Sequence, residues 1–101
     1  MLPKAHAPAS NTDAVVALTK RQKLHGVIWS YSGGTPTGSL IVSDGTIRSK
    51  HTLTSATSNT FWYGGIRSRT GNDLTITLAA GGSGVTGEIT VLYEDDDLLN
   101  L

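Results

Sequence analysis

The sequence predicts an all-β fold: an antiparallel β-sandwich, jelly-roll-like, with about seven strands and an extended N-terminal arm. Charged residues are only 16% of the chain, glycine occurs 12 times, and serine and threonine together fill 24 positions. Threonine favours strands, whereas glycine and serine mark turns. Short apolar runs recur at roughly ten-residue spacing with Gly-rich stretches between them, which is typical of sandwiches and jelly rolls.

A chain of 101 residues is the size of one domain. Such a chain buries roughly 60–70% of its unfolded surface, so its core is small and association between copies is a common way to add stability. We divide it into an extended arm over residues 1–13, a β-sandwich over residues 14–94 and an acidic, then apolar, tail over residues 95–101. The arm either orders against a neighbouring molecule or stays disordered, as termini often do.

Residues 24–31 form the stretch around which the sandwich is expected to be built, because they hold a tryptophan and the densest bulky apolar run. In a strand, Val27, Trp29 and Tyr31 fall on one face. Leu24 falls on the other face, together with Ile28 and Ser30. A strand that is apolar on one face and mixed on the other is typical of the middle of a sheet.

The other strands are bounded by turn signals. We expect them at residues 14–19, 39–43, 46–53, 60–66, 74–80 and 88–94. Asp44-Gly45 predicts a hairpin, and the type I′ turn expected there needs positive φ at both central positions. Gly64-Gly65 indicates a bulge or a sharp bend.

Composition argues against several classes of function. There is no cysteine, so neither a disulfide framework nor a thiolate metal site is expected, and the protein fits a cytoplasmic or virion-assembled setting better than a secreted one. The net charge is zero, which does not support a nucleic-acid partner. No apolar run is long enough to span a membrane, and the first residues lack the apolar core of a signal peptide.

Enzyme chemistry finds no support in the sequence. His6, His25 and His51 lack the i, i+4 spacing of a helical zinc site. The glycine-rich residues 81–84 lack the Gly-Lys-Ser/Thr and the helix of a phosphate loop, and the consecutive acids 94–97 lack the turning geometry of a calcium loop. We therefore expect a non-enzyme with no catalytic residue, no metal site and no cofactor.

Charge is unevenly spread along the chain. Residues 1–50 carry six Lys/Arg against two acids, and residues 51–101 carry two Arg against six acids, so the halves have formal charges of +4 and −4. Complementary halves can steer neighbouring subunits together, or they can neutralise each other within one fold.

The most conspicuous side chains are the aromatic run Phe61-Trp62-Tyr63 and the nearby arginines. Phe61 and Tyr63 share one face of the strand and are expected to complete the core, whereas Trp62 faces outward and is expected to be an interface anchor. Terminal leucines are expected to dock on their own sheet or on a neighbour. The interface candidates are Trp62, Arg67, Arg69, Asp95, Asp96, Asp97, Leu98, Leu99 and Leu101, with His6, Pro8 and Asn11 in the arm.

Four segments occur in order along the chain: Ile28-Trp29-Ser30-Tyr31, Pro36-Thr37-Gly38, Leu40 to Gly45, and the Gly-rich strand–loop–strand from Leu74 to Gly87. Taken together, these segments resemble a group of small tailed-bacteriophage virion proteins. The resemblance covers residues 8–93. The sequence departs from the family pattern over residues 54–69, where the aromatic run and two arginines stand in place of a Pro/Phe-rich strand.

The resemblance implies a structural role on a capsid: a decoration or cement protein that stabilises a phage capsid by bridging neighbouring subunits. The implied partners are the major capsid protein of a phage and further copies of the chain, as a dimer or trimer. The implied location is the capsid surface of the virion, with assembly in the host cytoplasm. The alternative is a glycan- or host-surface-binding module of a phage fibre, in which Trp62 and Tyr63 stack on sugars.

Overall fold

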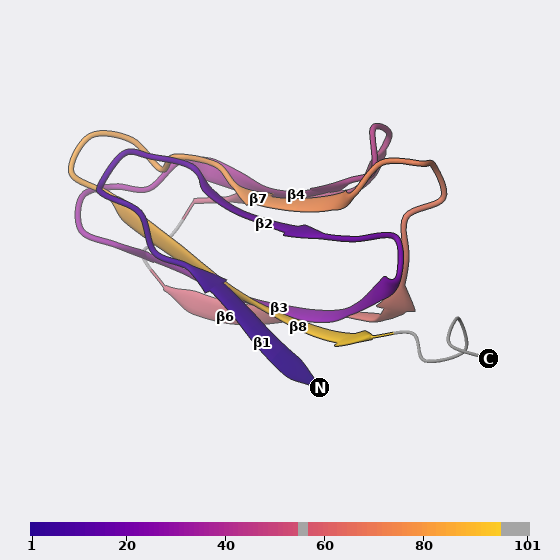
Figure 1. Cartoon of the computed structure of the whole chain (residues 1–101). Coiled ribbons are helices and arrows are strands. Elements are labelled where there is room, and N and C mark those ends of the chain that lie inside the picture. Colours follow the sequence, from indigo (N-terminus) through magenta and orange to yellow (C-terminus); the bar gives the residue numbers. More distant parts are fainter. Residues whose placement is uncertain (55–56, 96–101) are drawn as a thin grey trace.

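The computed structural model describes residues 1–54 and 57–95, which form eight strands (Figure 1). The strands are β1 (Leu2–His6), β2 (Ala14–Leu18), β3 (Gln22–Ser32), β4 (Gly38–Ser43), β5 (Ile47–Leu53), β6 (Ser58–Ile66), β7 (Leu74–Leu78) and β8 (Thr86–Asp95). No helix long and apolar enough to cross a membrane is found among the described residues.

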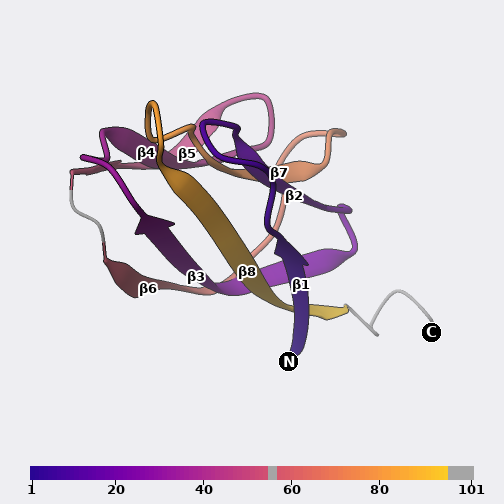
Figure 2. The same ribbon diagram turned by 90° about the vertical axis from the view of Figure 1, so that its left-hand side faces the viewer.

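The strands form two four-stranded antiparallel sheets that lie as two layers (Figures 1 and 2). Sheet A has the order β1-β8-β3-β6, and sheet B has the order β2-β7-β4-β5. The first and last strands are neighbours, and successive strands mostly change sheets, which is the strand order of a jelly roll. The predicted antiparallel, jelly-roll-like sandwich is therefore confirmed. The additional strand is β1, which lies in the segment predicted as an extended arm and pairs with β8 from Leu2↔Tyr93 to His6↔Ile89.

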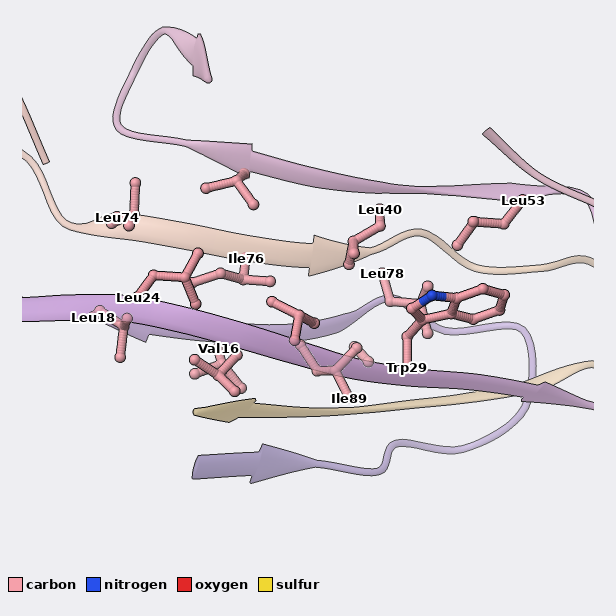
Figure 3. Packing of buried hydrophobic residues seen from close by; sticks show 14 of the residues in the cluster. Val16, Leu18, Leu24, Trp29, Leu40, Leu53, Leu74, Ile76, Leu78 and Ile89 are labelled. Carbon is pink, nitrogen blue, oxygen red and sulfur yellow. The ribbon is translucent and has the colours of Figure 1, made fainter. Parts of the chain in front are cut away.

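The core lies between the sheets and is apolar throughout. Val27, Trp29 and Tyr31 of β3 point into it, as their alternation predicts, and β3 lies between β8 and β6. Figure 3 shows Trp29 near Leu78, with side chains from both sheets filling the space between the layers. The buried cluster comprises Ala14, Val16, Leu18, Leu24, Val27, Trp29, Tyr31, Leu40, Val42, Leu53, Leu74, Ile76, Leu78, Val85, Ile89 and Val91.

A bulge corrects the expected alternation of β3. Leu24 was expected on the face opposite Trp29, but it is fully buried in the same core. The reason is a bulge: the pairing with β8 passes from Leu24↔Tyr93 to Gly26↔Leu92, so β3 has one extra residue, His25, and the faces exchange there. On the other side of β3, Gly26 pairs with Trp62 and Leu24 pairs with Ile66, so three residues of β6 lie opposite the single residue His25. The predicted bulge at Gly64-Gly65 lies within these three residues.

The β4–β5 hairpin is present, but its turn is not type I′. Ser43 pairs with Ile47, so the connection has three residues, and of these only Gly45 has positive φ, at 101°. Asp44 keeps an ordinary backbone conformation because its side chain turns inward and binds backbone groups of a neighbouring loop. A tertiary contact thus selects the turn over the local Asp-Gly preference.

Side chains close both long edges of the sandwich. At one edge, Lys4 Nζ donates to the carbonyl of Ala17 over 3.0 Å, and the Val15 N–H donates to His6 Nδ1 over 2.9 Å. These contacts join β1 to β2 without a strand ladder. At the other edge, the His51 and Phe61 rings stack with centroids 4.0 Å apart and planes 8° apart, which ties β5 to β6.

Candidate functional site

Trp62 stands on the outer face of sheet A and is the most exposed aromatic side chain described. It is 66% exposed, whereas its neighbours Phe61 and Tyr63 are partly buried against the core, in line with their alternation. The indole lies over Gly26: a Cβ at that position would come within 2.8 Å of Trp62 Cε3. The absence of a side chain at Gly26 therefore lets the ring lie close to the sheet.

Strand register places further apolar residues beside Trp62. Pro3 pairs with Leu92, Leu92 with Gly26, and Gly26 with Trp62, so these four form one row across all four strands of sheet A. The adjacent row contains Ile28, which is 41% exposed. We call these two rows the outer patch; its members are Pro3, Ala5, Gly26, Ile28, Thr60, Trp62, Thr90 and Leu92.

Polar pairs border the outer patch at both ends, while the patch itself contains no charged residue. Beyond one end, Ser30 Oγ donates to Glu88 Oε1 over 3.3 Å. Beyond the other, Lys23 Nζ lies 3.5 Å from Glu94 Oε1. An apolar centre with a large aromatic residue and a polar rim is the usual anatomy of a protein interface.

A second surface lies at the end of the sandwich where β2 turns into β3 and where β6 leads to β7. A pocket of about 500 Å³ opens between these two connections. Four of its lining residues are cationic, two carry hydroxyls and none is acidic; we call it the basic pocket, and it is lined by Lys20, Arg21, Arg67, Ser68, Arg69 and Thr70. The predicted interface residues Arg67 and Arg69 thus lie together with two cations from the opposite half of the sequence.

Asp44 holds one wall of the basic pocket in place. Its carboxylate is only 1% exposed and accepts hydrogen bonds from the backbone N–H of Arg69 at 2.9 Å and from Arg48 Nη1 at 3.2 Å. Its carbonyl accepts from Thr70 Oγ1 at 2.6 Å and from Asn72 Nδ2 at 3.3 Å. One buried residue therefore fixes the backbone of the loop that carries the pocket's arginines.

These contacts determine the charge state of Asp44. The backbone N–H of Arg69 lowers the pKa of the carboxyl below its ordinary value, with further lowering by the Thr46 N–H and by Arg48, and desolvation opposes the shift. The ionised carboxylate is satisfied internally by these donors. It therefore supports the pocket wall without closing the pocket.

The candidate residues of the arm make contacts within their own chain. His6 accepts the hydrogen bond from Val15, as described above. Asn11 donates its backbone N–H to the Val85 carbonyl over 2.7 Å and has φ of 53°, a left-handed conformation that asparagine tolerates. Pro8 is half-buried in the same connection. His6 therefore joins β1 to β2, and Asn11 joins the connection between them to the loop before β8.

At the C-terminal end, Asp95 is the last described residue, and its Oδ1 accepts a hydrogen bond from Gln22 Nε2 over 3.1 Å. This pair places the start of the acidic stretch next to the turn that carries Lys20 and Arg21. The remaining candidates of the tail, Asp96, Asp97, Leu98, Leu99 and Leu101, lie outside the described residues.

The three histidines occupy separate places. His6 and His51 lie at opposite edges of the sandwich, and His25 Nε2 lies 3.8 Å from Glu94 Oε1 on the outer side of β3. Within residues 1–54 and 57–95, no group of three His, Asp or Glu side chains is arranged to hold a metal ion.

Sequence reasoning missed two parts of this site. In the sequence, Lys20 and Arg21 count only toward the positive charge of residues 1–50, because nothing local indicates that residues 67–70 lie opposite them. Asp44 was assigned only to a hairpin turn, because burial of its carboxylate depends on a loop 25 residues away. The signal available in the sequence was that two pairs of basic residues, Lys20 with Arg21 and Arg67 with Arg69, each follow a predicted strand.

The sequence matches no family model. It also matches no curated protein. Among solved structures, the chain is similar to a de novo designed double-stranded β-helix determined by NMR in solution, with 14% sequence identity, a TM-score of 0.49 and coverage of 93% of this chain and 100% of that chain. A likeness of this size carries no argument about function.

Proposed function

We propose that this chain is a non-enzymatic structural virion protein that decorates a phage capsid and stabilises it by bridging neighbouring capsid subunits. The observation that supports the proposal is the outer patch, an uncharged surface across all four strands of sheet A with Trp62 exposed at its edge. Apolar surface that monomers keep in contact with water commonly marks a protein-binding face.

The mechanism of such a protein is mechanical. Its antiparallel sandwich, closed at both edges by side-chain contacts, provides a stiff body, and the outer patch provides the contact with the major capsid protein. Many copies on a repeating lattice gain avidity, so each contact can be modest. The chemistry of this surface therefore fits binding to a protein lattice on the capsid surface of the virion.

The test uses Trp62→Ala, with Ile47→Ala as the matched control because Ile47 is 60% exposed on β5, in the other sheet. Empty capsids of the phage that encodes the chain, assembled without it, are incubated with each protein and sedimented. Wild type and Ile47→Ala should co-sediment and raise the temperature at which the particles open, whereas Trp62→Ala should bind at least about tenfold more weakly. Equal binding by all three proteins, or none by wild type, would refute the proposal.

A second candidate function is favoured by the way Trp62 lies. One face of the indole covers Gly26 and the ring is mostly exposed, an arrangement that suits stacking on a sugar in a glycan- or host-surface-binding module. Ile28→Ser separates the two candidates, because protein docking needs the whole outer patch and sugar stacking needs the ring alone. Under the capsid proposal Ile28→Ser weakens particle binding; under the glycan alternative it leaves binding on a glycan array intact while Trp62→Ala abolishes it.

A further inference from the structure

We propose that the basic pocket binds a carboxylate-rich peptide segment, and that its occupant is the acidic stretch beginning at Glu94 of a second copy of the chain. The contact is reciprocal, so that two copies form a closed dimer through two equal charge contacts. This inference does not depend on the capsid proposal.

The first argument is the distribution of charge. The chain has eight Lys plus Arg and eight Asp plus Glu, so its net charge is zero. Four of the cations line the basic pocket, and four of the acids are consecutive, at residues 94–97. Half of the cations are therefore gathered in the pocket, and half of the acids are gathered in one short stretch of the sequence. These opposite charges attract each other between copies of a chain whose net charge is zero.

The second argument is the preorganised geometry of the pocket. Asp44 holds the wall that carries Arg69, as described above, and Arg48 Nη1 donates to the Arg67 carbonyl over 2.8 Å. The opposite wall is fixed where Thr19 N–H donates to Gln22 Oε1 over 3.0 Å and Gln22 N–H donates to the Thr19 carbonyl over 3.0 Å. A rigid backbone lowers the entropy lost on binding.

The third argument is that carboxylates of the described residues leave three of the pocket's cations, Lys20, Arg21 and Arg69, without an ion pair. No described carboxylate forms an ion pair with the side chain of Lys20, Arg21 or Arg69; the pairs present are Lys23–Glu94, His25–Glu94 and Arg48–Asp44. Arginine presents a planar fork of donors that matches a carboxylate. The pocket is therefore suited to carboxylates brought from outside the described fold.

For Glu94 and Asp95, a pocket on a second copy fits better than the pocket of their own chain. Within one chain, Glu94 is drawn to Lys23 and His25, and Asp95 to Gln22, and none of these partners lines the pocket. The Glu94 side chain is nevertheless 52% exposed, so a neighbouring molecule can reach it. A second copy can present these acids together with those that follow them in the sequence.

The position of the two surfaces sets the symmetry. The β2–β3 turn, the β6–β7 connection and the end of β8 lie at one end of the sandwich (Figure 1), and Gln22 pairs with Asp95 there. The pocket and the described start of the acidic stretch, Glu94 and Asp95, thus lie at the same end of one molecule. Two copies that meet at this end can place each acidic stretch in the other's pocket, which is a self-complementary two-fold contact and closes at a dimer.

The experiment measures native mass by sedimentation over a wide protein concentration range at low and high salt. The pocket variant is Lys20→Glu with Arg21→Glu, and the acidic variant is Glu94→Gln with Asp96→Asn and Asp97→Asn. Lys50→Glu is the matched control, because Lys50 is exposed on β5 and does not line the pocket. Unfolding midpoints establish that each variant is folded.

Wild type and Lys50→Glu should dimerise at low salt and dissociate as salt shortens the Debye length below about 8 Å. The pocket and acidic variants should each lose affinity by about fivefold per altered charge and remain monomeric when alone. Mixed in equal amounts they should form a heterodimer, because one intact pocket then meets one intact acidic stretch. Trp62→Ala should dimerise like wild type, which separates this contact from the outer patch.

Three results would overturn the proposal. The first is a wild type that is a monomer at every concentration at low salt. The second is a pocket variant that dimerises as well as wild type, and the third is a mixture that stays monomeric while wild type dimerises. The last result would show that the pocket and the acidic stretch do not meet between copies. None of these results depends on particle binding, so the proposal fails or stands separately from the capsid function.

Discussion

The buried carboxylate of Asp44 accepts a hydrogen bond from the backbone N–H of Arg69, 25 residues further along the chain, over 2.9 Å. This contact joins the β4–β5 turn to the β6–β7 connection and so links a hairpin in sheet B to the strand at the edge of sheet A. In the three-residue turn that the Asp-Gly hairpin adopts, the Asp44 carboxylate is buried and is held by this bond.

Replacing Asp44 by Asn should lower the thermal unfolding midpoint by several degrees at neutral pH. The amide keeps the size of the side chain but loses the charge that Arg48 and the backbone N–H groups stabilise. Calorimetry of the variant measures this loss. Asp73→Asn is the control, because Asp73 is an exposed acid in the same connection; an equal loss there would show that net charge, not the buried contact, is responsible.

Acid should destabilise the wild type through the same carboxyl. Its folded-state pKa is lowered, chiefly by the Arg69 N–H, so its contribution to stability is complete above the unfolded-state pKa and is lost as the pH falls through the folded-state value. Chemical unfolding at neutral pH and at about pH 3 measures the effect. Asp44→Asn should lose less stability than wild type between the two conditions, and parallel losses would contradict the assignment.

Gly38→Ala should destabilise the fold by about 1–3 kcal/mol through overpacking. A Cβ at Gly38 would overlap the Tyr31 hydroxyl and come within 3.2 Å of the Ala79 carbonyl. The control is Gly71→Ala, where no atom lies within 4 Å of the new Cβ. Urea unfolding compares the two variants.

Combining Gly38→Ala with Tyr31→Phe tests the cause of that loss. Tyr31→Phe alone removes the hydrogen bond from the hydroxyl to the Ala79 carbonyl, at a cost of about 1 kcal/mol. In the double variant the missing hydroxyl leaves room for the new Cβ, so the two losses should sum to more than the measured total. Simple additivity would show that the hydroxyl is not what opposes a side chain at Gly38.

High pH should also weaken the fold, through Tyr31. Burial raises the pKa of its hydroxyl by desolvating the phenolate, partly offset by the Ser39 backbone hydrogen bond. A raised folded-state pKa means that the stability contribution is complete below the unfolded-state value and is lost as the pH rises through the folded-state one. Unfolding midpoints at about pH 9 and about pH 11 should fall less for Tyr31→Phe than for wild type.

His6→Ala should expose the Val15 amide to exchange with solvent. The imidazole Nδ1 is the acceptor of that N–H at the edge of sheet B, and a net hydrogen bond of about 1 kcal/mol corresponds to about fivefold faster exchange when it is lost. Hydrogen exchange followed by NMR measures it. Lys4→Met, which removes the contact with the Ala17 carbonyl, is the comparison; equal acceleration in both would show that β1 detaches as a unit.

Much of the fold follows from local pattern. The alternation of Val27, Trp29 and Tyr31 places all three in the core, because side chains in a strand alternate faces whatever the strand's neighbours are. Leu24 breaks this rule, since the bulge at His25 reflects how two neighbouring strands align, and a single strand carries no signal for it.

The candidate site divides in the same way. The outward direction of Trp62 was predictable from its place between two inward-facing aromatics. Its setting over Gly26 depends on the pairing of β3 with β6. The row that continues through Leu92 to Pro3 depends on β8 and β1, which come from opposite ends of the chain. Local periodicity assigns a face, but only pairing in three dimensions assigns neighbours.

Local sequence pattern is enough to predict the all-β class, the sandwich, most of the inward-facing side chains and the presence of the β4–β5 hairpin. These follow from composition, period-two alternation and turn chemistry, all of which act over a few residues. Long-range packing is what places Lys20 and Arg21 in one pocket with Arg67 and Arg69 and what buries Asp44 against the loop of Arg69. Each of these depends on long-range closure of the jelly roll, which brings together residues that carry no local mark of one another.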